Sequence, residues 1–235
     1  MFNKALSLPA DSLILDLEDS VTPQNKDLAR VEVCEWLCSA DFGGREKLVR
    51  MNPIDSAWGR SDLEAIIACK PDGIVVPKVL DSKSVNAVSE VIKSKETEAG
   101  LEEGGISLLL IGTEEAGAVF NLPTMVSHPR VDGLTWGAED LSVSLGARAK
   151  RDEHGNYLEV FSFVRSMCLL AAVAARVQPI DAVYTDIKNL KGLQAECKTA
   201  ADMGYTGKLT IHPDQIEIVN EAFTPSKQEI DEAGE

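Results

Sequence analysis

The sequence predicts an α/β protein built as a (β/α)₈ barrel, in which parallel strands alternate with helices. Seven short apolar runs recur along the 235 residues, with helical segments between them. These runs lack polar alternation, which is typical of strands covered on both faces. In at least five of them charged or polar residues follow at the carboxyl end, where barrel enzymes build their sites from many strands.

Each predicted strand ends before a helix with a recognisable start. The strands are predicted at residues 12–18, 47–52, 73–79, 106–114, 131–140, 179–186 and 207–213. Helices are predicted after Thr22-Pro23 over 26–36, after Asp81-Ser82 over 83–95, and after Pro213-Asp214 over 215–222. An open doubly wound sheet is the alternative, but the chain has no GxGxxG or GxxxxGK[ST] phosphate turn, so a barrel is favoured.

Composition excludes several classes of protein. A net charge of −15 without a Lys/Arg cluster argues against a nucleic-acid partner. The longest apolar stretch, LLAAVAA at 169–175, is too short to cross a membrane, and no signal peptide opens the sequence. The five cysteines show no paired spacing. We therefore expect a single cytoplasmic domain over residues 1–235.

Two acids at strand ends are candidate metal ligands. Glu114 follows ISLLLIGT and Asp140 follows GLTWGAE, so their carboxylates could converge on one hard cation, for which Mg²⁺ is the natural candidate. The alternative is that one or both merely cap the helices that follow. The three histidines stand in neither HxH nor HExxH spacing, which argues against zinc.

Arg50 lies between Val49 and Met51, where an exposed arginine is not expected. A buried guanidinium needs anionic partners. The acids of LILDLEDSV (13–21) could hold it structurally, or its planar fork could bind a substrate carboxylate or enolate oxygen. We favour substrate binding. In the same run, Asp19 or Ser20 could instead cap the next helix.

Six sequence blocks resemble one known family: LILDLEDSVTPQNKDLAR, LVRMNP, GIVVPKV, GTEEAGAVFNLP, HPRVDGLTWGAEDLSVSLG and GYTGKLTIHPDQIEIVNEAF. They resemble the citrate lyase β-subunit-like, CoA-ester lyase branch of the HpcH/HpaI aldolase family. The resemblance implies a TIM barrel that assembles as a homotrimer or homohexamer. It also implies Mg²⁺-dependent cleavage or formation of a 3-hydroxyacyl-CoA thioester, such as malyl-, citramalyl- or citryl-CoA, with an acyl-CoA and a 2-oxo acid as products.

The resemblance also implies roles for particular residues. Glu114 in GTEEAG and Asp140 in GAEDLS resemble the family's Mg²⁺ ligands, with Glu115 as an adjacent alternative to Glu114. Glu114 is also expected to contribute to substrate binding.

Three further residues match family motifs near the predicted barrel mouth. Arg50 in VRMN resembles the arginine that binds the substrate carboxylate and the oxyanion. Glu18 and Asp19 in DLEDSV resemble the acids that hold metal-bound water and that arginine. Because no Schiff base is needed, Lys78 in VVPKV is expected to be a member of an ion pair.

The chain departs from the family pattern at both ends. Relatives usually begin with a strand resembling RSLLFVPG, where this sequence has MFNKALSLPAD, and they continue past FTPSKQEI into an arm whose aspartate acts as acid/base in a neighbouring subunit. We therefore expect a TIM-barrel catalytic domain that is shortened at both ends and lacks the first strand.

The functional alternatives are a class II aldolase acting on free 4-hydroxy-2-oxo acids, a malyl-CoA-type thioesterase, and a non-catalytic acyl-CoA-binding remnant. The pairing of DLED with IHPDQ favours CoA esters.

Overall fold

The computed structural model describes residues 2–227 and 230–231. Its centre is one sheet of seven parallel strands, in which strands that follow one another in sequence also pair in space. The strands are β1 (Ser12–Asp16), β2 (Glu46–Arg50), β3 (Gly73–Val76), β4 (Ser107–Ile111), β5 (Val131–Thr135), β6 (Gln178–Asp181) and β7 (Gly207–Lys208). All seven predicted strands are confirmed. All seven end earlier than predicted because the predicted ranges ran on into the loops that follow the strands.

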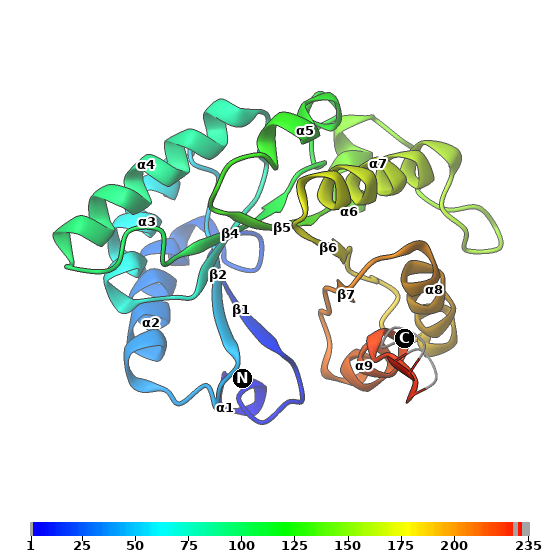
Figure 1. Ribbon diagram of the computed structural model, residues 1–235, viewed down its shortest axis with the longest axis horizontal. Helices are drawn as coiled ribbons and strands as arrows, with labels where there is room; N and C mark the ends of the chain where they lie inside the picture. Colours follow the sequence, from blue (N-terminus) through cyan, green and yellow to red (C-terminus); the bar gives the residue numbers. More distant parts are fainter. Residues whose placement is uncertain (1, 228–229, 232–235) are drawn as a thin grey trace.

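The sheet is curled, and helices cover its outer face, while β1 and β7 form its two edges (Figure 1). The helices are α1 (Phe2–Ala5), α2 (Lys26–Ser39), α3 (Gly59–Ile66), α4 (Ser82–Glu98), α5 (Leu122–Met125), α6 (Ala138–Ser144), α7 (Glu159–Ala175), α8 (Leu190–Met203) and α9 (Ile216–Phe223). Short 3₁₀ turns lie at Pro23–Asn25, Ile67–Cys69, Ala118–Asn121 and Pro213–Gln215. This is a TIM-barrel-like α/β fold with one strand fewer than eight, as predicted.

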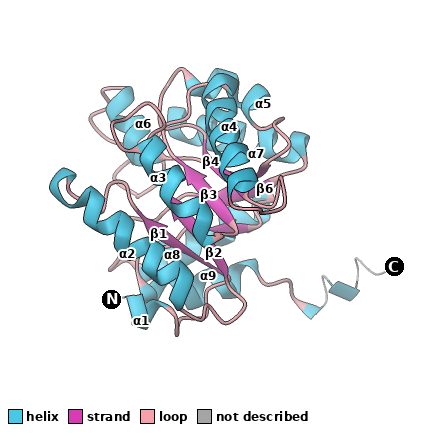
Figure 2. Ribbon diagram, turned by 90° about the vertical axis from the view of Figure 1, so that its left-hand side faces the viewer, coloured by secondary structure: helices cyan, strands magenta, loops and turns pink. Residues whose placement is uncertain are grey.

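Local sequence signals place the helix ends. The Asp81 side chain accepts hydrogen bonds from the backbone N–H groups of Lys83 and Ser84, and so satisfies two free donors at the start of α4. At the end of α8, Gly204 adopts φ 109°, a left-handed conformation that glycine reaches without strain. The helices predicted over 26–36, 83–95 and 215–222 correspond to α2, α4 and α9. Figure 2 shows residues 224–227, which follow α9, leading away from the helical layer.

The two faces of the sheet bury different clusters. The outer face packs against the helices and forms the main core, which includes Leu13 and Leu15. The inner face carries a smaller apolar cluster of Ile14, Leu48, Val75, Leu109 and Ile111. Because side chains alternate along a strand, Asp16 and Arg50, each two residues beyond a member of this inner cluster, share its face. The inner face thus leads to the carboxyl ends of the strands.

A buried group of charges lies behind the last strands, and we call Asp181, Arg165, Lys208 and Glu196 the outer ionic cluster. Asp181 on β6 accepts hydrogen bonds from Arg165 Nη2 at 2.8 Å, Lys208 Nζ at 2.7 Å and Trp136 Nε1 at 2.8 Å. Lys208 also lies 3.0 Å from Glu196 on α8. Burial opposes ionisation of Asp181, but the two cations prevail and lower its pKa. The cluster ties β6 and β7 to α7 and α8.

No helix within residues 2–227 and 230–231 is long and apolar enough to span a bilayer.

Candidate active site

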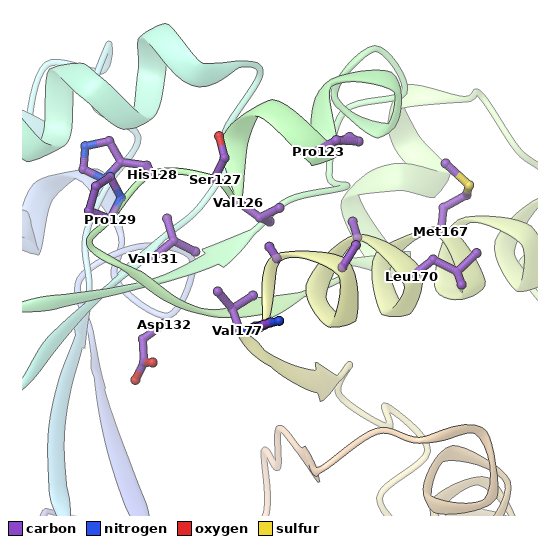
Figure 3. Close-up of a pocket in the computed structure, with 14 residues that line it drawn as sticks. Pro123, Val126, Ser127, His128, Pro129, Val131, Asp132, Met167, Leu170 and Val177 are labelled. Atoms are coloured by element: carbon purple, nitrogen blue, oxygen red, sulfur yellow. The ribbon is translucent and has the colours of Figure 1, made fainter.

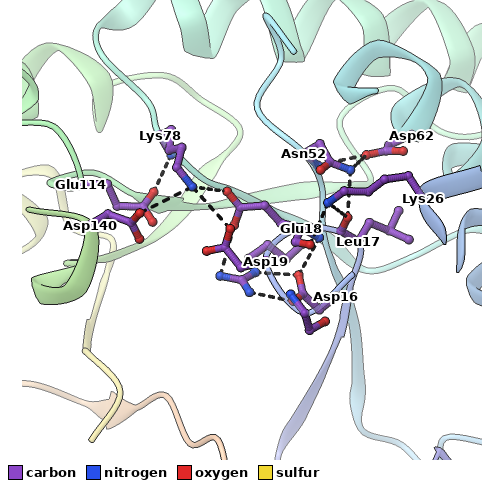
Figure 4. Close-up of polar contacts among 12 residues, drawn as sticks. Asp16, Leu17, Glu18, Asp19, Lys26, Asn52, Asp62, Lys78, Glu114 and Asp140 are labelled. Carbon is purple, nitrogen blue, oxygen red and sulfur yellow. Dashed lines mark hydrogen bonds and ion pairs between the residues drawn. The ribbon is translucent and has the colours of Figure 1, made fainter. Parts of the chain in front are cut away.

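The charged side chains predicted from the first strands meet at the carboxyl edge of the sheet (Figure 4). Asp16 and Arg50 are register partners on β1 and β2. Arg50 Nε and Nη2 each donate to one oxygen of Asp16, both at 2.7 Å. This bidentate pair is the strong, directional form of an ion pair. An acid of LILDLEDSV therefore holds the arginine.

The pair is ionised throughout the neutral range. Burial disfavours the charged form of Asp16, but its hydrogen bonds and the charge of Arg50 lower the pKa to about 2. The pKa of Arg50 is raised in turn, because the hydrogen bond and charge of Asp16 outweigh its burial. Asp16 was not among the predicted site residues. Its position at the carboxyl end of β1, two residues after Ile14 on the inner face, was the signal that could have identified it.

Glu18 joins the two cations of the site. Its Oε1 lies 2.5 Å from Lys78 Nζ, and its Oε2 lies 3.2 Å from Arg50 Nη1. The carboxyl group is almost fully buried, and this burial raises its pKa even though both cations act against the shift. The expectation that Lys78 is a member of an ion pair is confirmed. Lys78 itself has φ 51°, which turns its backbone N–H toward the neighbouring strand end.

Asp19 occupies a more peripheral position than Glu18. Its side chain is 57% exposed, and among the residues that the structure describes its carboxylate pairs only with Lys78, at 3.8 Å. Asp19 therefore stands at the rim of the site, where water has access to it.

Glu114 is a buried acid with little compensation. Its Oε2 accepts a hydrogen bond from the backbone N–H of Lys78 at 2.5 Å, and within the described part of the chain it forms no ion pair. Burial, together with the charges of Glu18 and Asp140, raises its pKa to about 8, although the Lys78 hydrogen bond opposes this. Gly137 makes room for it, since a Cβ there would lie 2.7 Å from Glu114 Cγ.

Asp140 lies in the first turn of α6 and faces the same region as Glu114 (Figure 4). Its Oδ1 is 3.7 Å from Lys78 Nζ, and its side chain is 36% exposed. The helix N-cap residue is Gly137, and the described residues show no side-chain cap hydrogen bond at this end. Among the described residues neither Asp140 at the start of α6 nor Glu114 before the turn at Ala118–Asn121 makes a side-chain cap hydrogen bond.

The donors present fit a magnesium ion. Mg²⁺ binds through one or two protein carboxylates and keeps several waters. The residues described include no group of three or more His, Cys, Asp or Glu side chains arranged for a metal, whereas a buried carboxyl without a cation stands beside a second acid. A hard divalent ion would supply the positive partner that the Glu114 carboxylate lacks.

Two polar residues at strand ends turn away from the site. Asn52 Nδ2 donates to Asp62 at 2.7 Å, so it serves the packing of α3. Glu139 pairs with Lys150 at the surface. Position at a strand end brings a residue near the site, but the direction of the side chain decides whether it takes part.

Glu115, the alternative to Glu114, also points away. It is exposed and accepts a hydrogen bond from Ser144 Oγ at 3.0 Å. The geometry brings Glu114, and not Glu115, together with Asp140.

Fold and site together define a TIM-barrel-like protein with a carboxylate and guanidinium site at the carboxyl ends of its strands. A family model for HpcH/HpaI aldolase/citrate lyase matches residues 1–213. The chain belongs to this family.

Characterised relatives match nearly the whole chain. It is 37% identical over 228 residues to a (3S)-malyl-CoA thioesterase of Cereibacter sphaeroides, covering 97% of this chain and 74% of the relative. Citrate lyase subunit beta of Escherichia coli is 33% identical, with 99% of this chain and 76% of the relative covered. Mitochondrial citramalyl-CoA lyase of Mus musculus is 31% identical, with 99% and 70% covered. The predicted enzyme class, carbon–carbon lyase, is confirmed at the level of the family.

Solved structures agree in fold. CitE of Mycobacterium tuberculosis, in complex with magnesium, acetoacetate and coenzyme A, superposes with a TM-score of 0.80 at 32% identity, covering 99% of this chain and 79% of that one. RipC of Yersinia pestis gives a TM-score of 0.79 at 27% identity, with 96% and 94% covered. Magnesium, the predicted cofactor, thus accompanies a close structural relative.

Proposed function

We propose that this protein is a Mg²⁺-dependent lyase that cleaves or forms a 3-hydroxyacyl-CoA thioester such as malyl-, citramalyl- or citryl-CoA. The products of cleavage are an acyl-CoA and a 2-oxo acid. The observation that carries the proposal is the buried, uncompensated Glu114 beside Asp140, linked through Lys78 and Glu18 to an arginine held in a fixed orientation. Such an arrangement suits a reaction in which negative charge develops on oxygen.

Glu114 and Asp140 would hold the metal. When bound, Mg²⁺ supplies Lewis acidity toward the carbonyl oxygen of a 2-oxo acid. Lys78 pairs with Glu18 at 2.5 Å and lies 3.7 Å from Asp140, so the acids of the site are divided between a fixed cation and the metal.

Arg50 can bind substrate without losing its structural partner. An arginine has five N–H donors. In Arg50, Nε and Nη2 contact Asp16 and Nη1 contacts Glu18, so three of the five donors are used. The remaining donors and a 25% exposed side chain leave it open to a substrate carboxylate or enolate oxygen. Asp16 fixes the plane of the guanidinium, which reduces the entropy lost on binding.

The reaction balances without an external oxidant or reductant. In the cleavage direction the 3-hydroxyl group loses its proton and the adjacent carbon–carbon bond breaks. The electron pair of that bond enters the thioester enolate, and a proton then returns to its carbon. Arg50 stabilises the oxygen charge that appears during this transfer, an effect typically worth about 3 kcal/mol per donor.

Thioester hydrolysis is the second candidate, and the 37% identity to a malyl-CoA thioesterase favours it. Hydrolysis yields free CoA and a hydroxy acid, with the carbon–carbon bond intact. The exposed Asp19 at the rim of the site is a position from which an attacking water could be held.

Product analysis decides between these functions. The purified protein is incubated with Mg²⁺ and, separately, with malyl-CoA, citramalyl-CoA, citryl-CoA and a free 4-hydroxy-2-oxo acid. Chromatography then separates acyl-CoA, free CoA and 2-oxo acid. Acyl-CoA with 2-oxo acid supports the lyase, free CoA with malate the thioesterase, and turnover of the free acid alone the class II aldolase. Lack of turnover of any substrate would leave an acyl-CoA-binding remnant and refute the proposal.

Matched variants locate the activity. Glu114→Gln is expected to abolish turnover, whereas Glu115→Gln, one residue further on and exposed, is expected to retain it. Equal losses in both variants would contradict the assignment of Glu114.

Assembly as a homotrimer or homohexamer and a cytoplasmic location are parts of the same proposal. The free thiols of all five cysteines support a reducing compartment.

A further inference from the structure

Three of the five cysteines lie close together. Cys34 and Cys38 belong to α2, and Cys69 ends the 3₁₀ turn that comes before β3. Cys34 and Cys38 are four positions apart, so they lie one above the other on the same face of the helix. α2 packs against the turn that holds Cys69, and the Cys69 thiol interacts with the thiols of both other residues. We call Cys34, Cys38 and Cys69 the thiol cluster.

The thiol cluster lies at the end of the fold opposite to the candidate active site. Its two helical members are in the second half of α2, which leads to the start of β2, and Cys69 comes just before the start of β3. The cluster is therefore near the amino ends of these strands, whereas the acids and Arg50 of the candidate site are at carboxyl ends. In barrels the amino-end face contributes to stability rather than to catalysis.

The three thiols differ in their access to solvent. Cys38 is exposed, whereas Cys34 and Cys69 are partly buried and pack against the main core. Burial raises the pKa of Cys69, and the two neighbouring thiols raise it further; burial also raises the pKa of Cys34. Both thiols therefore stay protonated in neutral solution and are weak nucleophiles. An oxidant in the solvent reaches Cys38 first.

Helix geometry excludes one of the three possible pairs. The Cβ atoms of helical residues four positions apart are about 5–6 Å from each other. A disulfide needs a Cβ separation of about 3.5–4.5 Å. Cys34 and Cys38 thus cannot be bridged while α2 remains helical. Cys69 comes from another segment and interacts with both thiols, so it is the partner that an oxidised Cys38 can reach.

We propose that the thiol cluster is a modification site for hydroperoxides, at which Cys38 and Cys69 form a reversible disulfide. Hydrogen peroxide transfers an oxygen atom to the Cys38 sulfur, its O–O bond breaks, and a sulfenic acid and one water result. The Cys69 sulfur then attacks the Cys38 sulfur, the S–O bond breaks, and hydroxide leaves with the Cys69 proton as a second water. The two thiols lose two electrons in all, and the peroxide gains them.

This inference is independent of the proposed function, because no member of the thiol cluster belongs to the candidate active site. It is also compatible with free thiols in a reducing compartment, since the disulfide forms only when peroxide is present and thiol exchange reverses it.

Thiol counting and peptide mapping test the disulfide. The full chain is treated with hydrogen peroxide at neutral pH, its free thiols are counted after denaturation, and the remaining thiols are alkylated before digestion and mass spectrometry. We expect the count to fall from five to three and to return to five with dithiothreitol. The linked peptides should contain Cys38 and Cys69. A count that stays at five, a bridge from Cys34 to Cys69, or a bridge between two chains would overturn the proposal.

Matched variants assign the two sulfurs. After peroxide treatment Cys38→Ser and Cys69→Ser should each yield no linked peptides. Cys34→Ser removes the third member of the cluster and is the control, in which the bridge should form as in wild type. Circular dichroism checks that all three variants are folded. Loss of the bridge in Cys34→Ser, or a bridge in either of the other two variants, would contradict the assignment.

Methionine oxidation must be separated from the disulfide, because peroxide also converts accessible methionines to sulfoxides. Met167 is partly exposed and lines a hollow of about 730 Å³ between α5 and α7 (Figure 3). A sulfoxide adds an oxygen atom and resists dithiothreitol, whereas the disulfide removes two hydrogen atoms and is reversed by it.

Unfolding gives a second readout of the bridge. A disulfide constrains the unfolded chain, so peroxide treatment should shift the urea midpoint of the wild type to a higher concentration. The shift should disappear with dithiothreitol and should be absent in Cys69→Ser. An equal shift in wild type and Cys69→Ser would overturn the proposal.

Discussion

The protein contains two clusters of buried charge that differ in how completely their charges are compensated. In the outer ionic cluster, Asp181 is fully buried and accepts hydrogen bonds from two cations, Arg165 and Lys208, and from the Trp136 indole. Its pKa is lowered. At the candidate active site, Glu114 is almost as deeply buried, has one backbone hydrogen bond, and has its pKa raised to about 8.

This difference separates a structural charge from a functional one. A buried carboxylate surrounded by cations stabilises the packing that surrounds it, as long as its partners remain. A buried carboxyl beside other acids is costly to ionise and becomes stable as an anion only when a further cation arrives. The first kind of carboxylate needs no further partner, whereas the second has a site for an added cation.

The largest expected effect is on the outer ionic cluster. Asp181→Asn leaves Arg165 and Lys208 buried without their shared anion, so the free energy of unfolding should fall by about 3–5 kcal/mol. Urea unfolding followed by circular dichroism measures it. Asp202→Asn removes an exposed acid paired with Lys198 and should cost less than about 1 kcal/mol. Similar losses in the two variants would remove the distinction between the clusters.

A smaller effect is expected at Arg50. Arg50→Lys keeps the charge but loses the planar fork, so the affinity for a 2-oxo acid such as oxaloacetate in the presence of Mg²⁺ should weaken by about 1.5–3 kcal/mol, or roughly 10- to 150-fold. Isothermal titration calorimetry provides the measurement. Arg60→Lys, an exposed arginine paired with Glu64, should bind like the wild type. Unchanged affinity in Arg50→Lys would place the substrate elsewhere.

The smallest effect concerns Glu114 without metal. Its pKa is raised from 4.5 to about 8 on folding, so the folded protein holds an extra proton between these values and loses stability as the pH rises through them. In the presence of a chelator, Glu114→Gln removes this dependence. Its stability relative to wild type should therefore be higher at pH 9 than at pH 6, by about 1 kcal/mol or more.

Unfolding midpoints at the two pH values provide the test, with Glu115→Gln as the control. Parallel pH profiles for wild type and Glu114→Gln would show that Glu114 is not an uncompensated acid.

The sequence predicted the strands well because fully buried parallel strands are continuous apolar runs between turn signals. The sequence also predicted that four site residues lie at one edge of the sheet, because the carboxyl ends of parallel strands meet there. These residues are Arg50, Glu18, Glu114 and Asp140. Asn52 and Glu139 show the limit of that reasoning. A position after a strand does not determine where the side chain points.

The outer ionic cluster was beyond prediction for another reason. Asp181, Arg165, Glu196 and Lys208 come from two strands and two helices, and no spacing in the sequence links them. Their contact depends on how α7 and α8 pack behind the sheet. Partners on neighbouring strands, such as Asp16 and Arg50, can be inferred from the sequence once the strand order is known.

Magnesium titration of the purified protein tests the central claim, that Glu114 and Asp140 share a divalent cation. Calorimetry compares wild type, Asp140→Asn and Glu139→Gln, the last being the adjacent acid that pairs with Lys150. We expect one site per chain in wild type and Glu139→Gln, and at least a tenfold weaker site in Asp140→Asn, a loss of about 1.4 kcal/mol or more. Equal Mg²⁺ affinity in all three proteins would contradict the account.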